Sequence, residues 1–266
     1  MTTAIAAATL LDRAWSCLNE GDHRFARTLA TDALASSALD EHLSGEAHLI
    51  RGQSFFMDGE NDGEDDDIQS AKTSLTTAIG LLDREDAEIL TDAANLAIAL
   101  GKLDVAAELA DTALAATDDS ADAFYVRGLI ANAAGDGVTQ VRCFQRTAEI
   151  DLKEPVPPWS MTTDDFTAVV EESFAPLPEA IKVRLEEIPI IVEPAPSAEL
   201  IADGIDPRLF VLFSKVFAEE SANQQPTLNA IHIYQRNLEA ECSEGTALAE
   251  EIRDSVEQEA IRFFDL

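Results

Sequence analysis

The chain of 266 residues carries 51 Asp and Glu against 18 Lys and Arg, a formal net charge of −33. Because such a field repels phosphate backbones and anionic membrane surfaces, we expect no nucleic-acid or membrane partner. The hydrophobic fraction of 46% is that of a globular protein, and no apolar run is long enough to span a bilayer. The acidity fits either a solvated surface, as in a salt-adapted protein, or attraction of basic partners.

The N-terminus and the cysteines point to one compartment. The first segment, "MTTAIAAATLLDRAW", has no basic leading residues, and its apolar run is broken at Asp12 and Arg13, so we expect no signal peptide. The three cysteines, Cys17, Cys143 and Cys242, are odd in number and widely spaced. They fit reduced side chains better than a disulfide framework or a zinc cluster. We therefore predict a cytoplasmic protein.

An internal period organises the first half. The segment "GKLDVAAELADTALAATD", from Gly101, aligns without gaps onto "GDGVTQVRCFQRTAEIDL", from Gly135, and "GDHRFARTLATDAL" repeats the pattern from Gly21. Small or apolar residues then recur at helical spacing: Ala26, Ala30 and Ala33; Ala106, Ala110 and Ala113; Gln140, Phe144 and Thr147. The 34-residue period, the turn glycine and the ladder resemble tetratricopeptide repeats, in which small residues let two helices of a hairpin pack closely.

This resemblance implies an all-α solenoid of helical hairpins, which we place over residues 1–155. We predict four units, at about 7–40, 45–86, 87–120 and 121–154. The segments "AHLIRGQSFFMDGE" and "AFYVRGLIANAAGD" are predicted first helices, with Gly52 and Gly128 at the position of close packing.

An insertion is predicted in the second unit. Its ladder, Ala71, Leu75 and Ala78, stays in register only if about seven residues are skipped, and these fall in "DGENDGEDDD", residues 58–67. Solenoids tolerate insertions at helix turns, so we predict a disordered acidic loop there.

A calcium site is the alternative for this insertion. Several residues imitate the start of an EF-hand loop, namely Asp58, Glu60, Asp62, Gly63 and Asp66. The twelfth position, where an EF-hand needs a bidentate Glu, is Gln69. Calcium binding is left open.

The character of the chain changes after Pro155. The prolines of "EPVPPW" predict a linker, and the helix "DFTAVVEESFAPLP" is expected to begin at a cap formed by Asp164 or Asp165. A short helix is predicted in "PEAIKVRLEE". Strands are predicted in "IPIIVEPAP", in "DPRLFVLFSKVFAEES" and in "LNAIHIYQRNLEAEC", where Gln235 begins the exit. A last helix is predicted over residues 245–264. The predicted fold class is therefore α+β.

This order of elements, from Phe166 to the end, resembles the minimal zincin-like metallopeptidases of bacteria. The phrases that carry the likeness are "FTAVVEESFAPLPEAIKVRLEEIPIIVEPAPSAEL", "DPRLFVLFSKV", "IHIYQRNLE" and "LAEEIRDSVEQEAIRFFDL". Members of that family end on a helix with His-Glu-x-x-His, whose two imidazoles share one helical face and bind zinc while the Glu polarises the metal-bound water. The resemblance implies a zincin-like domain over residues 156–266.

The family's zinc motif is changed in this chain. The resemblance puts Gln258 and Arg262 at the two His positions and Glu259 at the Glu position, and it puts the third, acidic ligand just beyond Leu266. A neutral amide is a poor zinc ligand and a guanidinium offers no lone pair. We therefore expect no bound metal, no other cofactor and no catalytic residue.

The leading hypothesis is a non-catalytic interaction or adaptor protein that joins a peptide-binding solenoid to a pseudo-metallopeptidase domain. Solenoids of helical hairpins present their first helices on a concave face, where extended or helical peptides bind. By register, the candidate contacts are Trp15, Asn19, Gln53, Phe56, Asn95, Tyr125 and Asn132. No lysine occupies these positions, so we expect a basic or polar ligand and not a C-terminal carboxylate.

Two alternatives remain. One is a working metal-dependent peptidase with unorthodox ligands, such as Glu257, Glu259 and Asp265 with His232. The other is a purely structural assembly subunit, in which the terminal helix docks on the solenoid.

Overall fold

The structure is a computed structural model that describes residues 2–36, 39–62, 65–216, 227–242 and 244–266. The chain divides into two compact units, Met1–Ile150 and Asp151–Leu266. We call them the first unit and the second unit and describe each by itself. The α+β fold class is confirmed, because helical repeats come first and a small sheet with helices follows.

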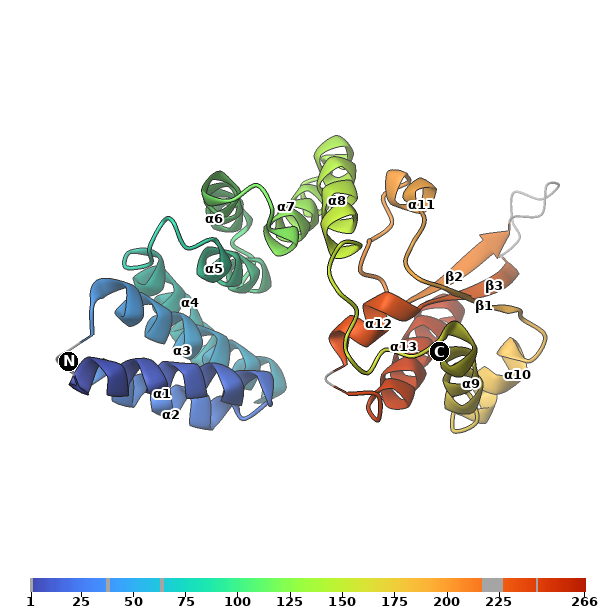
Figure 1. Cartoon of the computed structure of the whole chain (residues 1–266), viewed down its shortest axis with the longest axis horizontal. Helices are drawn as coiled ribbons and strands as arrows, with labels where there is room; N and C mark the ends of the chain where they lie inside the picture. Colours follow the sequence, from blue (N-terminus) through green and yellow to red (C-terminus); the bar gives the residue numbers. More distant parts are fainter. Residues whose placement is uncertain (1, 37–38, 63–64, 217–226, 243) are drawn as a thin grey trace. The chain divides into compact units, whose positions relative to one another are not determined.

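The described part of the first unit consists of four helical hairpins (Figure 1). The helices are α1 Thr2–Asn19 and α2 His23–Leu34, α3 Glu41–Asp62 and α4 Asp65–Ile79, α5 Ala87–Ala99 and α6 Leu103–Ala116, and α7 Ala121–Ala133 and α8 Gly137–Asp151. Each of the first three pairs makes its most extensive contacts within the hairpin, as in repeat solenoids.

The predicted turn glycines adopt left-handed backbone. Gly21, Gly101 and Gly135 have φ of +81°, +70° and +73°, values that favour glycine because it has no Cβ. At the α5 turn the Lys102 N–H donates to the Ala97 carbonyl at 2.8 Å, the bond of a Schellman cap. The repeat's glycine is therefore explained by the way its first helix ends.

Close helix packing explains the small residues at other positions of the repeat. A Cβ on Gly128 would lie 2.5 Å from the Phe144 ring, and one on Gly52 would lie 2.9 Å from a Leu96 methyl. The alanines of the predicted ladders in α2 and α6 are all buried. Small residues thus permit the helices to approach, as the repeat pattern predicts.

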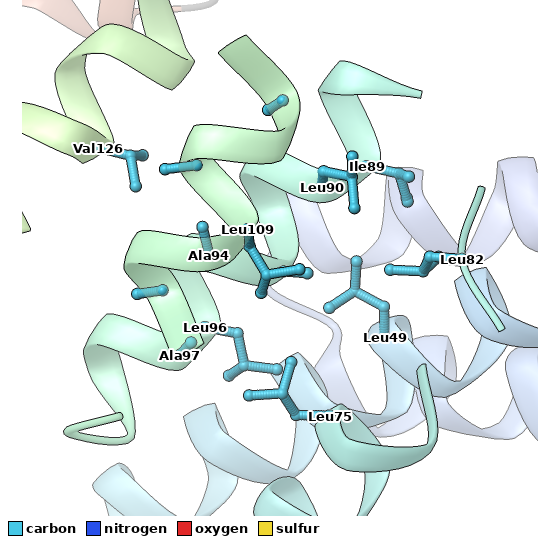
Figure 2. Packing of buried hydrophobic residues seen from close by; sticks show 14 of the residues in the cluster. Leu49, Leu75, Leu82, Ile89, Leu90, Ala94, Leu96, Ala97, Leu109 and Val126 are labelled. Atoms are coloured by element: carbon cyan, nitrogen blue, oxygen red, sulfur yellow. The ribbon is translucent and has the colours of Figure 1, made fainter. Parts of the chain in front are cut away.

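One hydrophobic cluster of the first unit runs from the second hairpin to the fourth (Figure 2). It joins Leu49 of α3, Leu75 of α4, Leu96 of α5, Leu109 of α6 and Val126 of α7. Because each hairpin buries its apolar face only against its neighbours, these side chains form one continuous cluster along the stack.

The predicted disordered loop at residues 58–67 is wrong. Helix α3 continues to Asp62 and α4 begins at Asp65, so most of the insertion lengthens the two helices; Gly63 and Glu64 lie outside the described residues. Asp65 to Asp67 occupy the first turn of α4, where carboxylates are favoured by the helix dipole. Asp58 is 8% exposed and pairs with Arg27 at 2.9 Å. This helical backbone differs from an EF-hand loop.

The second unit holds the predicted strands and further helices. Its elements are α9 Thr163–Ser173, α10 Glu179–Leu185, β1 Ile190–Glu193, α11 Ala198–Ala202, β2 Val211–Val216, β3 Thr227–Tyr234, α12 Gln235–Glu241 and α13 Leu248–Phe264. The cap of α9 corrects a prediction. Thr162, and not Asp164 or Asp165, caps the helix, because its hydroxyl oxygen accepts the Asp165 N–H at 3.2 Å.

The three strands form a sheet in the order β1-β3-β2, with β1 parallel and β2 antiparallel to β3 (Figure 1). Ile231 and Ile233 of β3 pair with Phe213 and Val211 of β2, and all four are buried in one cluster with Val256 of α13. Helix α13 therefore lies against the sheet through its apolar face. Among the described residues, no helix combines the length and hydropathy needed to cross a bilayer.

Candidate functional site

A cavity of about 640 Å³ opens on the face of the first unit that the first helices of its hairpins form. Its lining comes from α1, α3, α5 and the cap of α5: Asp12, Trp15, Asn19, His42, Glu46, Gln53, Asp86, Glu88, Ile89 and Asp92. Three of the seven predicted peptide contacts, Trp15, Asn19 and Gln53, therefore lie together. We call this feature the concave cavity.

Helical spacing explains the lining. Asp12, Trp15 and Asn19 are three and then four residues apart, so they share one face of α1. His42 and Glu46 are four residues apart on α3. The cavity lies where these helix faces meet, so the sequence of a single helix does not predict it.

Trp15 is fixed in the wall of the cavity. Its indole Nε1 donates to Glu46 Oε1 at 2.7 Å, which joins α1 to α3. Burial raises the pKa of Glu46, while the bond from Trp15 and the nearby His42 act in the opposite direction. The ring is therefore held in position by a carboxylate that is itself half-buried.

Asp92 is the most perturbed carboxyl group of the cavity. Burial raises the pKa of Asp92 to about 6, and the neighbouring Glu88, Asp122 and Asp86 raise it further. Among the residues that the structure describes, no cation contributes to this shift. The ionised carboxylate is thus destabilised first by its burial and then by the neighbouring like charges.

His42 is the sole basic side chain in the described lining of the cavity. The Asp83 backbone N–H donates to His42 Nδ1 at 3.3 Å, and His42 Nε2 lies 3.6 Å from Asp86 Oδ2. Since Nδ1 accepts, a neutral His42 carries its proton on Nε2, which then faces the carboxylate of Asp86.

The other four predicted contacts lie elsewhere on the first unit. Phe56 is partly buried against the core, and Tyr125 stacks on Phe144 with ring centroids 6.0 Å apart. Asn95 and Asn132 are exposed on α5 and α7. The structure does not bring these four side chains into the concave cavity.

The acids of the cavity are functional candidates that the sequence reasoning did not select. Asp92 lies three residues before Asn95, Asp12 three before Trp15, and Glu46 seven before Gln53, so each shares a helix face with a predicted contact. Following these faces for one or two more turns would have found them.

The second candidate site is the end of α13. Gln258 is exposed, and Arg262 Nη1 lies 3.1 Å from Glu259 Oε2. Burial raises the pKa of Glu259, whereas Arg262 and Lys215 of β2 act to lower it. The Lys215 ammonium also lies 5.2 Å from the centre of the Phe263 ring. Two cations therefore surround the carboxylate of Glu259.

Comparison with known protein families gives two matches. A tetratricopeptide repeat model matches residues 91–148, which covers most of α5 to α8, and a zincin-like metallopeptidase model matches residues 185–266. The chain combines tetratricopeptide repeats with a zincin-like domain. Both resemblances drawn from the sequence are confirmed. A search of curated proteins finds no match.

The residues at the zincin-like motif do not fit a zinc ion. At the two positions that the sequence resemblance assigns to zinc-binding imidazoles, the chain has the amide of Gln258 and the guanidinium of Arg262, which is 76% exposed and paired with Glu259. Neither group can replace a neutral imidazole as a zinc donor. No reaction step through a metal can be derived from this arrangement.

The alternative ligand set is not assembled either. Within the described ranges, no three or more His, Cys, Asp or Glu side chains are grouped closely enough to hold a metal ion. His232 of β3 instead bonds through Nδ1 to Glu193 Oε2 of β1 at 2.8 Å. Glu257, Glu259 and Asp265 therefore do not form a metal-binding group with it.

Proposed function

We propose that this protein is a non-catalytic interaction or adaptor protein. Its repeat unit holds a peptide or protein partner on the concave face, and its zincin-like domain is a pseudo-metallopeptidase. Tetratricopeptide repeats generally mediate protein–protein contacts, which supports a protein partner. The observation that carries the non-catalytic role is the ion pair of Arg262 with Glu259 at 3.1 Å, at the position where a peptidase needs a second imidazole.

The chemistry of peptide hydrolysis explains why this pair matters. In a zinc peptidase the metal lowers the pKa of a bound water, and the motif Glu accepts its proton. With an amide at Gln258 and a guanidinium at Arg262, Glu259 has no activated water to deprotonate. The helix then contributes its apolar face to the fold, with Val256 and Ala260 buried.

A basic partner is part of the proposal. Five carboxylate side chains line the concave cavity, and the chain carries a net charge of −33, which favours encounter with cationic proteins. We propose that Trp15, Asn19 and Gln53 contact this partner; Phe56, Asn95, Tyr125 and Asn132 remain predictions.

A cytoplasmic location is also proposed. The three cysteines are free, and Cys143 and Cys242 are buried with thiol pKa values raised by burial. Buried, unreactive thiols suit a reducing compartment.

Metal content and peptidase activity test the non-catalytic role. The purified full-length protein is expected to contain no stoichiometric zinc and to leave a mixture of unstructured peptides intact. The double variant Gln258→His with Arg262→His serves as a matched comparison, because it restores the imidazole pair. Stoichiometric zinc in the unmodified protein, with peptidase activity that a chelator abolishes, would overturn the proposal.

A further inference from the structure

We propose that the concave cavity binds one cationic side chain, the Lys or Arg of an extended partner segment, between Trp15 and the carboxylates of Glu46 and Asp92. This inference rests on the proposed function, since it names the chemistry that the repeat unit recognises. The proposal covers one residue of the partner and the part of the concave face that lines the cavity.

The first argument is that the cavity's negative charge has no matching cation. Neither lysine nor arginine belongs to the described lining, and its one basic side chain, His42, lies with Nε2 3.6 Å from Asp86 Oδ2. Elsewhere on the first unit, acids do have arginine partners: Arg127 bonds Asp111 at 2.8 Å. A cation from another molecule would relieve the repulsion that the cavity's acids exert on Asp92.

A second cavity in the same unit gives an internal comparison. It encloses about 680 Å³ and is lined by Arg127, Arg142 and Arg146 together with Asp111, Asp118 and Glu149. Its arginines and acids are equal in number, so it carries no excess of negative charge. The lack of arginine in the concave cavity is therefore a local property and not a consequence of the chain's composition alone.

The third argument is the aromatic and amide surface of the concave cavity. The Trp15 indole is fixed by its 2.7 Å bond to Glu46, so it presents an ordered ring to a ligand. Aromatic faces attract ammonium and guanidinium groups. Asn19 and Gln53, on α1 and α3, supply amides that can bond the backbone of an extended segment. The cavity thus offers more than negative charge.

The spread of the carboxylates favours a side chain over a bare metal ion. Over the part of the chain that is described, no three His, Cys, Asp or Glu side chains converge closely enough to ligate one ion. Calcium and zinc require such convergence. A long, flexible cationic side chain can instead interact with carboxylates distributed over the walls of a 640 Å³ cavity.

Two matched probes test this inference on the full-length protein. One is a fluorescent nonapeptide with a central Arg in a Gly-Ser background, and the other carries citrulline, which has the same shape without the charge. Fluorescence anisotropy at pH 7.5 and low salt is expected to show about tenfold tighter binding of the Arg probe. Equal binding of the two probes, or binding of neither, would overturn the inference.

Charge variants distinguish the cavity from the general acidity of the protein. Asp92→Asn is expected to remove most of the preference for Arg over citrulline, and Glu46→Gln is expected to reduce it. Asp32→Asn, at an exposed position of α2, removes the same charge and is expected to change the affinity less than about twofold. Equal losses in Asp92→Asn and Asp32→Asn would overturn the proposed site.

Folding and function are controlled separately. Glu46→Gln disturbs the bond to Trp15, so circular dichroism accompanies each variant, and Asp92→Asn decides the outcome if Glu46→Gln unfolds. If the unmodified protein shows neither a preference for Arg over citrulline nor chelator-sensitive peptidase activity, the cation cavity is contradicted and the adaptor role stays intact. Chelator-sensitive peptidase activity contradicts the non-catalytic role and leaves the probe result unaffected.

Discussion

Asp92 in the repeat unit and Glu259 in the zincin-like domain are half-buried carboxyl groups in opposite surroundings. Burial raises the pKa of both. The neighbours of Asp92 are acids and raise its pKa further, whereas Arg262 and Lys215 act to lower the pKa of Glu259. A cation from another molecule would stabilise the ionised form of Asp92, whereas the carboxylate of Glu259 already has cations beside it.

A third carboxylate, Asp58, should show the largest effect of breaking a pair. Arg27 lies 2.9 Å from Asp58, whose side chain is 11% exposed, so Arg27→Met leaves a buried charge without this close partner. We expect the free energy of unfolding to fall by about 2–3 kcal/mol in urea denaturation.

The neighbouring Arg24 provides the control for this prediction. It lies 3.9 Å from the same carboxylate, but its side chain is 73% exposed. Arg24→Met should therefore cost less than about 0.5 kcal/mol. Similar losses in the two variants would show that Asp58 does not depend on the buried partner.

Removing the charge of Asp92 should stabilise the protein, because the ionised form of this carboxyl group opposes folding. The native state keeps the Asp92 proton up to about pH 6, while an unfolded Asp loses it near its ordinary pKa of 3.8. The native state therefore binds more protons in this interval, and stability falls as the pH rises from about 4 to above 6. Asp92→Asn should remove that fall and be about 1–2 kcal/mol more stable at pH 7, a reduced value because the cavity is open to water.

Urea denaturation of the parent protein and of Asp92→Asn at several pH values measures this difference in the free energy of unfolding. The charged and titratable groups that face Asp92 or line its cavity are Glu88, Asp86, Asp122, Asp12, Glu46 and His42. A variant as stable as the parent at pH 7 and at pH 4 would contradict the assignment.

The smallest effect is expected at α13. Removing the exposed guanidinium in Arg262→Gln leaves Lys215 as the remaining cation near Glu259, so the pKa of Glu259 should rise further. The free energy of unfolding should change by less than about 0.5 kcal/mol, as for other exposed pairs three residues apart. A carboxyl NMR titration measures the shift, and an unchanged or lower pKa would contradict the pairing.

Local chemistry explains what could be predicted of the fold. The turn glycines and alanine ladders are set by backbone conformation and helix contact distance, which act within one hairpin, so Gly101 and Ala106 indicate the repeat from sequence alone. The prediction of a disordered loop at residues 58–67 was wrong because it relied on the acidic composition of this segment. Asp65 to Asp67 instead favour a helix start through the dipole of α4.

The candidate site was harder to predict because it depends on three helices at once. Register placed Trp15, Asn19 and Gln53 on helix faces that the structure joins in one cavity. Tyr125 has a similar register, but its ring stacks on Phe144 of the next helix, a contact that depends on hairpin packing. Asp92 was overlooked since its altered pKa arises from burial and from residues on other segments.

The length of α3 has a consequence for how this protein can vary. The helix runs for 22 residues, with His42, Glu46 and Gln53 in its first four turns and the inserted acids at its far end. Changes of charge at the exposed Asp65 and Asp66, in the first turn of α4, should therefore leave the geometry of the cavity wall unchanged. One helix therefore carries part of the cavity wall near its start and the acidic segment at its end.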